Sequence, residues 1–442
     1  MTSSPTPTTP TTAPALSRTG ALWMLAGLLL LTINLRAAIT GVTPMLGDLQ
    51  ETFGLTGVEV SVLTTLPVLC LGAFASLAPV LARRYATEPI VAAALVMITV
   101  GVVLRIVPSP PALFGGTVLA GAGIAMGNVL LPAVIKRFFP RRVGSLNGAA
   151  MMLMATSGAV AAGLAVPLDD AAGWRVALAI WAVPSAFAAL LWGPPALRAM
   201  RGDGWAAPGP RERDAAVHDH GSLLRSPLAW YVTAFMGLAS LMFYVLMSWL
   251  PEIMRDHGQP PAVAGSMVSF MMIIGIPLGY VAPVVAARMR DQRPLVIAIG
   301  AVMVVGLTGL LLAPGPDWVW VTILGLGTGS AFPLGFTLLS LRSPSPSVAA
   351  RLSGMSQTGG YIFASFGPLA FGVLHSATGG WDLSLILLLI LVVPEVVIGL
   401  LAARPGFVRT LPSRPERLLE RDEKDQDARA AVPSGGSPAP PR

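Results

Sequence analysis

The segments Ser145-Leu-Asn-Gly148 and Gly173-Trp-Arg175 have counterparts later in the chain, Arg351-Leu-Ser-Gly354 and Gly380-Trp-Asp382, and this repetition decides the fold. The displacement is about 206 positions in both cases, and Leu119-Ala-Gly-Ala-Gly123 matches Leu324-Gly-Leu-Gly327 at nearly the same displacement. Self-similarity at one fixed displacement indicates a duplicated structural unit. Chance easily supplies one short motif, but it rarely supplies several in register. The sequence therefore predicts two related halves.

The composition predicts that both halves lie in a lipid bilayer. Of the 442 residues, 54% are hydrophobic and 12% are charged, and the mean hydropathy is +0.71. Soluble proteins carry about 25% charged residues, and no soluble fold of this length can bury so much apolar surface. The net charge of +7 does not indicate a nucleic-acid partner, because the basic residues lie between apolar runs, as membrane topology requires.

Twelve apolar runs, most of them longer than the roughly 20 residues that cross a bilayer, divide six and six around a polar segment. They lie near 21–47, 57–82, 87–107, 110–137, 143–168, 172–195, 227–254, 262–288, 294–313, 317–342, 349–375 and 379–403. The sequence therefore predicts an all-α membrane protein with twelve transmembrane helices in two pseudo-symmetric six-helix halves. We expect a disordered tail over 1–19, the first half over 20–196, a cytoplasmic linker over 197–226, the second half over 227–403 and a disordered tail over 404–442.

The basic residues predict the orientation of the chain, because cytoplasmic loops are enriched in Lys and Arg. With the N-terminus inside, the cytoplasmic loops hold Arg83, Arg84, Lys136, Arg137, Arg141, Arg142, Arg288, Arg290, Arg293, Arg342 and Arg351. The opposite side then holds only Arg105, Arg175 and Arg255 among the basic residues. We expect both termini to be cytoplasmic.

Arg36 is the most informative ionisable residue, since charged groups inside a membrane are costly and need a reason to be there. Counted from Ala21, it lies about 22 Å along the first span, too deep to reach the cytoplasm easily. One interpretation is a fixed charge in a central cavity, where the guanidinium donates two parallel hydrogen bonds to a substrate anion. The other is a structural arginine that binds carbonyls or a carboxylate and braces the bundle.

The remaining polar residues inside the runs have two interpretations each. Uncharged donors and acceptors that either line a cavity or join helices are Asn34, Thr40, Asn128, Asn147 and Gln357. Glu395 in the last run is a candidate for coupling: a proton site, an ion-pair partner for Arg36, or a residue near the cytoplasmic end that meets water. Arg83 and Arg84, between the second and third runs, are candidates for a gating loop or for topology alone. The glycines of spans four and ten indicate close helix packing.

The sequence does not indicate an enzyme active site or a metal site. Cys70 is the single cysteine, so a disulfide within the chain and a cysteine-based metal site are excluded. The four histidines are too dispersed for a metal cluster, and no acids, histidines or ligand sets converge near one end of the spans. We therefore expect no enzyme, no metal and no cofactor.

Three stretches resemble the cyanate and nitroimidazole transporter group of the major facilitator superfamily. They are Asn34-Leu-Arg-Ala-Ala-Ile-Thr-Gly-Val-Thr-Pro44, Ser248-Trp-Leu-Pro-Glu252 and Ser356-Gln-Thr-Gly-Gly-Tyr361 with Phe366-Gly-Pro368. The resemblance implies a monomeric carrier in the bacterial inner membrane that moves a small anion or small heterocycle by alternating access. It places Asn34, Arg36, Trp249 and Gln357 in the substrate cavity. Members of this superfamily carry a gating loop with a Gly-x-x-x-Asp-Arg type sequence at the position of Arg83 and Arg84. This chain lacks the acidic residue of that sequence.

Two functions fit these observations. In the preferred one, Arg36 binds a small anionic substrate and Asn34, Thr40, Trp249 and Gln357 complete the site. In the alternative, the chain is a drug or metabolite exporter in which Arg36 is structural and methionine-rich spans form an adaptable apolar pocket. The two differ in whether uptake survives Arg36→Gln.

Overall fold

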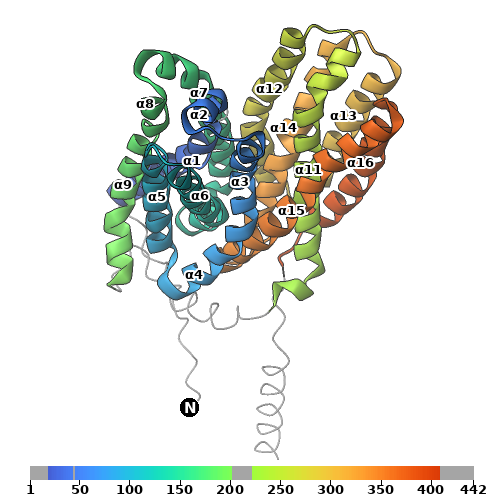
Figure 1. Cartoon of the computed structure of the whole chain (residues 1–442). Helices are drawn as coiled ribbons and strands as arrows, with labels where there is room; N and C mark the ends of the chain where they lie inside the picture. Colours follow the sequence, from blue (N-terminus) through green and yellow to red (C-terminus); the bar gives the residue numbers. More distant parts are fainter. Residues whose placement is uncertain (1–17, 43–44, 202–221, 409–442) are drawn as a thin grey trace, which may run out of the picture.

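The computed structural model describes residues 18–42, 45–201 and 222–408, and these residues form a bundle of helices (Figure 1). The first part contains α1 (Arg18–Thr40), α2 (Leu46–Phe53), α3 (Gly57–Ala75), α4 (Leu77–Tyr85), α5 (Thr87–Leu104), α6 (Pro110–Phe138), the 3-10 helix η2 (Pro140–Arg142), α7 (Val143–Ala172), α8 (Trp174–Ala179) and α9 (Ala182–Met200). The second part contains the 3-10 helix η3 (Leu223–Arg225), α11 (Pro227–Asp256), α12 (Pro261–Arg288), α13 (Arg293–Leu312), α14 (Asp317–Leu341), α15 (Pro346–Thr378) and α16 (Asp382–Ala402).

The helices agree with the twelve predicted spans in number but not in every boundary. Within the described residues, ten helices are long and apolar enough to cross a membrane when α8 and α9 are taken together. The other two spans are α15 and the pair α3–α4, in which the chain breaks at Ser76. The first predicted run, 21–47, was too long, because α1 ends at Thr40 and the short helix α2 follows it. Hydropathy does not register such breaks because the flanking residues remain apolar.

The bundle has two ends, which we name by the short helices found there. The α4 end carries α4 and the start of α1, and the α2 end carries α2 (Figure 1). Most of α6 is buried, and in the first part α5 packs on α6 and α9 while α1 packs on α7. In the second part α11 packs on α15 and α12 on α14, with α13 and α16 on the outside of that group. The two parts meet through α7 with α12 and through α15 with α3 and α6.

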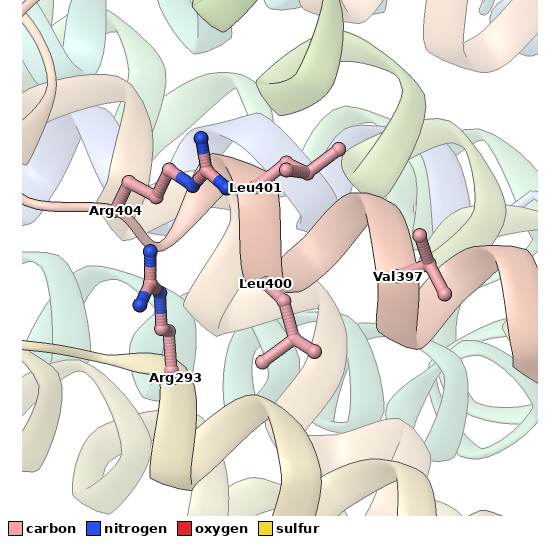
Figure 2. Close-up of a pocket in the computed structure, with 5 residues that line it drawn as sticks. All are labelled: Arg293, Val397, Leu400, Leu401 and Arg404. Carbon is pink, nitrogen blue, oxygen red and sulfur yellow. The ribbon is translucent and has the colours of Figure 1, made fainter.

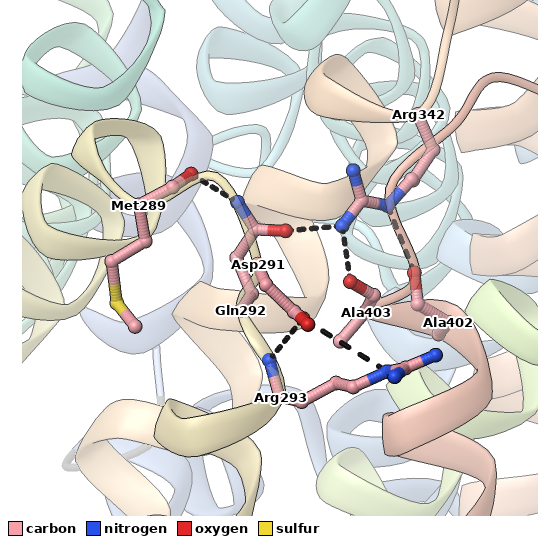
Figure 3. A network of polar contacts seen from close by, with 7 residues as sticks. All are labelled: Met289, Asp291, Gln292, Arg293, Arg342, Ala402 and Ala403. Carbon is pink, nitrogen blue, oxygen red and sulfur yellow. Dashed lines mark hydrogen bonds and ion pairs between the residues drawn. The ribbon is translucent and has the colours of Figure 1, made fainter.

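The internal repeat is visible as a pair of corresponding contacts at the α4 end. Arg137, at the end of α6, forms an ion pair of 3.3 Å with Glu88 at the start of α5. Arg342, 205 positions later at the end of α14, donates to the side-chain oxygen of Gln292 beside the start of α13. Arg342 also donates to the carbonyls of Ala402 (2.9 Å) and Ala403 (2.8 Å) at the end of α16 (Figure 3). Each part thus uses an arginine to tie its fourth long helix to its neighbours.

The predicted close packing at the glycines of span ten is confirmed at the crossing of α12 and α14. A Cβ atom built on Gly329 would lie only 2.4 Å from the Cα of Gly275. Backbone atoms cannot move aside as a flexible side chain can, so position 329 requires glycine for this approach. Small residues at helix crossings are the usual means by which membrane helices gain packing contacts.

Replacing Gly329 with valine should destabilise the protein by about 1–3 kcal/mol, the usual cost of overpacking a well-packed core. The measurement is the midpoint of thermal unfolding in detergent. Gly163→Val on α7 is the matched control, because Gly163 is also helical and a Cβ there meets no atom within 4 Å. Equal midpoints for the two variants would contradict the assigned crossing.

Candidate functional site

Arg36 projects from α1 toward α7 because the neighbouring face of α1 is occupied by α6. Leu35 packs on α6, where a Cβ on Gly127 would lie 2.6 Å from its Cδ2 atom. Arg36 follows on the next face, and a Cβ on Gly158 of α7 would lie 2.8 Å from its Cγ atom. The side chain is half-buried, and its guanidinium forms no hydrogen bond or ion pair with any residue that the structure describes. The glycine at position 158 is what leaves room for it.

Tyr361 of α15 faces the same region from the second part of the chain. Its side chain is buried, and its hydroxyl lies within electrostatic range of both Arg36 and Tyr244 of α11. Tyr361 therefore lies close enough to a cation of the first part and to a phenol of α11 to interact with each of them electrostatically. Sequence reasoning did not assign a role to either tyrosine. The available signal was a phenol directly after two glycines in an apolar span.

Gln357 lies one helical turn before Tyr361, on the same face of α15. Its Nε2 atom donates to the Ser353 hydroxyl at 2.8 Å, while its Oε1 atom is buried without a partner among the described residues. The same is true of the side-chain oxygens of Asn128 on α6 and Asn147 on α7. A buried acceptor without a donor is costly, so these oxygens are available to a donor that enters the bundle.

Two further predicted site residues of α1 have hydrogen-bond partners, Thr40 across to α7 and Asn34 within α1. Thr40 donates from its hydroxyl to the Gly158 carbonyl (3.0 Å) and contacts the Arg36 carbonyl (3.2 Å), so it joins α1 to α7 beside Arg36. Asn34 is buried, and its Nδ2 atom donates to the Leu30 carbonyl at 2.7 Å. Thr40 thus lies next to Arg36, whereas the Asn34 amide group bonds within its own helix.

Trp249 lies apart from the other predicted residues. Its indole Nε1 donates to the Pro368 carbonyl at 2.8 Å, and its ring centroid lies 5.5 Å from that of Trp381. Pro368 is seven residues beyond Tyr361, about 10 Å farther along α15 toward the α2 end. No described contact brings Trp249 to the Arg36 region.

Arg105 is a residue whose role the sequence did not reveal. It lies in the connection between α5 and α6, where the sequence placed it, and its side chain is buried, with 2% exposure. Its Nη1 atom donates to the Ala38 carbonyl (2.6 Å) and its Nε atom to the Thr117 hydroxyl (3.1 Å). It also lines a cavity of about 20 Å³, which is room for one water. Arg105 therefore braces α1 two residues from Arg36.

The contacts between the two parts of the chain gather toward the α4 end. Lys136 at the end of α6 donates to two carbonyls of the second part. One is that of Ser340 (2.8 Å), in the last turn of α14, and the other is that of Ser343, just after α14. Asn147 donates to the Ser340 hydroxyl at 3.3 Å. Farther from the α4 end, Thr358 of α15 donates to the Gly72 carbonyl of α3 at 3.2 Å. Among the residues that the structure describes, no hydrogen bond joins the two parts on the α2 side of this last contact.

A family model described as the Major Facilitator Superfamily matches residues 28–368. The chain belongs to the major facilitator superfamily. It is 36% identical to the "2-nitroimidazole transporter" of Escherichia coli (strain K12) over 400 residues, which cover 90% of this chain and 100% of that protein. It is 29% identical to the "Cyanate transport protein CynX" of the same organism over 361 residues, covering 81% and 91% of the two chains.

The fold of the proton:xylose symporter XylE is also similar, with a TM-score of 0.66 at 15% identity over 86% of this chain and 94% of that one. The chain is thus a multi-pass membrane transporter of this superfamily, of the cyanate and nitroimidazole transporter type. Such transporters move small molecules and lie in the membrane. The resemblance inferred from the three sequence stretches is confirmed.

The two arginines of the gating loop expected in this superfamily lie in the last turn of α4, just before α5. The side chain of Arg83 lies outside the described residues. Arg84 is exposed, and its guanidinium carbon lies 5.4 Å from the centre of the Tyr85 ring. At this level α15 contacts α4 through Gly354, where a Cβ would lie 2.8 Å from Pro79. A gating role for the two arginines stays a prediction.

Glu395 of this superfamily member does not meet water. Its side chain is buried in the second part of the chain, with 3% exposure, and both carboxyl oxygens lack a partner among the described residues. It forms no described ion pair with Arg36. The third interpretation, a residue near the cytoplasmic end that meets water, was wrong, because α11 and α13 cover the face of α16 that carries this residue. The interpretation of Glu395 as a proton site stays a prediction.

Proposed function

We propose that this transporter carries a small anion, cyanate-like or an ionised small heterocycle, across the bacterial cytoplasmic membrane by alternating access. The observation that carries the proposal is the half-buried Arg36 guanidinium, which has no partner among the described residues. A cation in a membrane protein interior is costly unless a negative charge is paired with it. A bound anion would supply that charge when the cavity is loaded.

The residues around Arg36 suit a small planar anion. The guanidinium presents a rigid fork of donors, and the Tyr361 hydroxyl lies within its electrostatic range on the other side. The buried Gln357 oxygen offers an acceptor for the N–H group of a heterocycle. The printed functions of the two relatives, 2-nitroimidazole and cyanate transport, agree with a small substrate, and cyanate agrees with an anionic one.

The distribution of contacts supports one state of an alternating-access cycle. With the N-terminus in the cytoplasm, the α4 end is the cytoplasmic end, and Lys136 and Asn147 close it. The site would then be reached from the α2 side, where no described hydrogen bond joins the two parts. Rocking of the two six-helix halves, 20–196 and 227–403, would break the contacts at the α4 end. The proposed transporter works as a monomer with both termini inside.

A ligand screen on the purified protein tests the substrate class. Cyanate and nitrate, neutral 2-nitroimidazole and a lipophilic cation are compared by their effect on the thermal unfolding midpoint, since a ligand that binds only the folded state raises it. We expect the anions to stabilise the protein, and liposomes containing it to take up the same anions. Stabilisation by the cation alone would overturn the anion proposal and favour the exporter in which Arg36 is structural.

Glu395→Gln is expected to separate coupling from substrate movement. Glutamine keeps the size of the buried side chain but cannot carry a proton, so a Glu395 that couples transport to protons would lose uphill accumulation driven by a pH gradient. Exchange of labelled for unlabelled substrate should continue at the wild-type rate. Both are measured in the same liposomes. Full accumulation by the variant would assign Glu395 a structural role only.

A further inference from the structure

We propose that a phospholipid with an anionic headgroup binds in a pocket between α13 and α16 at the α4 end of the bundle. The pocket has a volume of about 290 Å³ and is lined by Arg293, Val397, Leu400, Leu401 and Arg404. Figure 2 shows the two arginines reaching toward the same side of the end of α16, with the apolar side chains along that helix. The pocket lies outside the Arg36 region, so this proposal does not depend on the transported substrate.

The charges of the pocket favour an anion. Arg404 forms no hydrogen bond or ion pair with the residues that the structure describes. Arg293 has one carboxylate near it, Asp291, at the long distance of 3.9 Å and on the exposed surface. Two guanidinium groups therefore share one distant acid. A phosphate diester accepts hydrogen bonds from such groups more readily than a neutral ligand does.

The surface that continues from the pocket favours a lipid over a free phosphate ion. Ile386, Ile390, Val393 and Val397 are all exposed and follow one another along α16 at spacings of four, three and four residues. This spacing places them on one face of the helix, in a track of about 16 Å from Ile386 to Val397. Exposed apolar residues on α13, including Ile297 and Val304, lie on the neighbouring helix. An acyl chain would lie along this track while its phosphate contacts the arginines.

The position of the pocket is also that of a lipid headgroup. Apolar helices end at this level, and the basic residues of the chain gather at this end of the bundle, the arrangement that attracts anionic lipids. The neighbouring Arg342 ties α14 to the end of α16 and to the loop before α13 (Figure 3). A lipid phosphate between Arg293 and Arg404 would join α13 to α16 at the same joint, so binding should stabilise this part of the protein.

Thermal unfolding of the delipidated, full-length protein with added lipid tests the proposal. We expect phosphatidylglycerol to raise the unfolding midpoint of the wild type by several degrees, and phosphatidylcholine or inorganic phosphate to raise it much less. Arg293→Gln/Arg404→Gln should lose at least half of the phosphatidylglycerol effect. Arg141→Gln/Arg142→Gln removes the same charge from exposed positions at the same end and should retain it.

Native mass spectrometry provides a second readout. The wild type should retain at least one phosphatidylglycerol molecule more than the Arg293/Arg404 double variant. An equal phosphatidylglycerol effect in both double variants, or an equal number of retained lipids, would overturn the proposal. So would an equal shift by inorganic phosphate, which would assign the pocket to a phosphate ion, or by phosphatidylcholine, which would show that the headgroup charge is irrelevant.

Discussion

Arg36→Gln should weaken binding of the proposed anionic substrate by about 100-fold or more, since charge-assisted hydrogen bonds contribute roughly 1.5–3 kcal/mol each and a planar anion accepts two of them. Glutamine retains a donor and most of the volume beside Gly158, but it supplies neither the charge nor the fork of donors. Arg36→Lys keeps the charge and loses the fork, so we expect a smaller loss, about tenfold for one lost bond. Binding is measured by ligand-dependent thermal shift and uptake in liposomes.

Arg175→Gln is the matched control for this experiment. Arg175 is an exposed arginine near the α2 end, with its guanidinium carbon 4.8 Å from the centre of the Trp174 ring. Removing it changes the net charge by the same amount without touching the Arg36 region, so binding should stay at the wild-type level. Normal anion binding by the Arg36→Gln protein would refute the substrate role and leave Arg36 as a bracing residue.

Lys136→Met should shift the protein away from the state that is closed at the α4 end. The lysine ammonium group donates to two carbonyls across the boundary between the two parts, at Ser340 and Ser343. Methionine preserves the apolar stem but donates nothing. Losing two charge-assisted bonds, offset by renewed hydration of the carbonyls, should change the open-to-closed ratio by about 10- to 100-fold.

Distances between spin labels measure this shift. Labels at cysteines replacing Arg141 and Arg290, exposed residues on the two parts of the chain at the α4 end, should show a longer separation in the Lys136→Met protein. Cys70 is buried and is replaced by serine beforehand. Arg142→Met, which removes an exposed charge at the same end, serves as the control. An unchanged distance distribution in the Lys136 variant would show that these bonds do not hold the end closed.

Several features of the fold could be predicted from the sequence because the bilayer leaves few options. Spanning segments need about 20 apolar residues and must satisfy their backbone hydrogen bonds internally, so apolar runs predict helices. The motifs around Ser145 and Arg351 predicted related halves, and the contacts of Arg137 and Arg342 lie at corresponding positions. The stretch from Asn34 to Pro44 predicted the transporter group. These signals are local in the chain, so they can be interpreted without knowing how the helices pack together.

The surroundings of individual polar residues could not be predicted in the same way. Arg105 was placed only on one side of the membrane, and contact with water was one of three interpretations for Glu395, yet both side chains are buried. Trp249 was grouped with Arg36, yet its indole bonds to Pro368. Hydropathy states that a residue belongs to a span, but the rotation and tilt of the helix decide which neighbour the residue faces, and these depend on packing between helices.

Arg36 illustrates the difference between what the sequence determines and what the tertiary structure determines. The sequence by itself determined that a cation lies in the first span, far from the cytoplasmic start of that span, and that such a cation needs a counter-charge. Only the tertiary structure decided that Gly158 makes room for it, that Tyr361 faces it from the other part of the chain, and that no described side chain neutralises it. The reason is physical: chain position sets depth in the bilayer, whereas contacts between helices distant in the sequence set the partners.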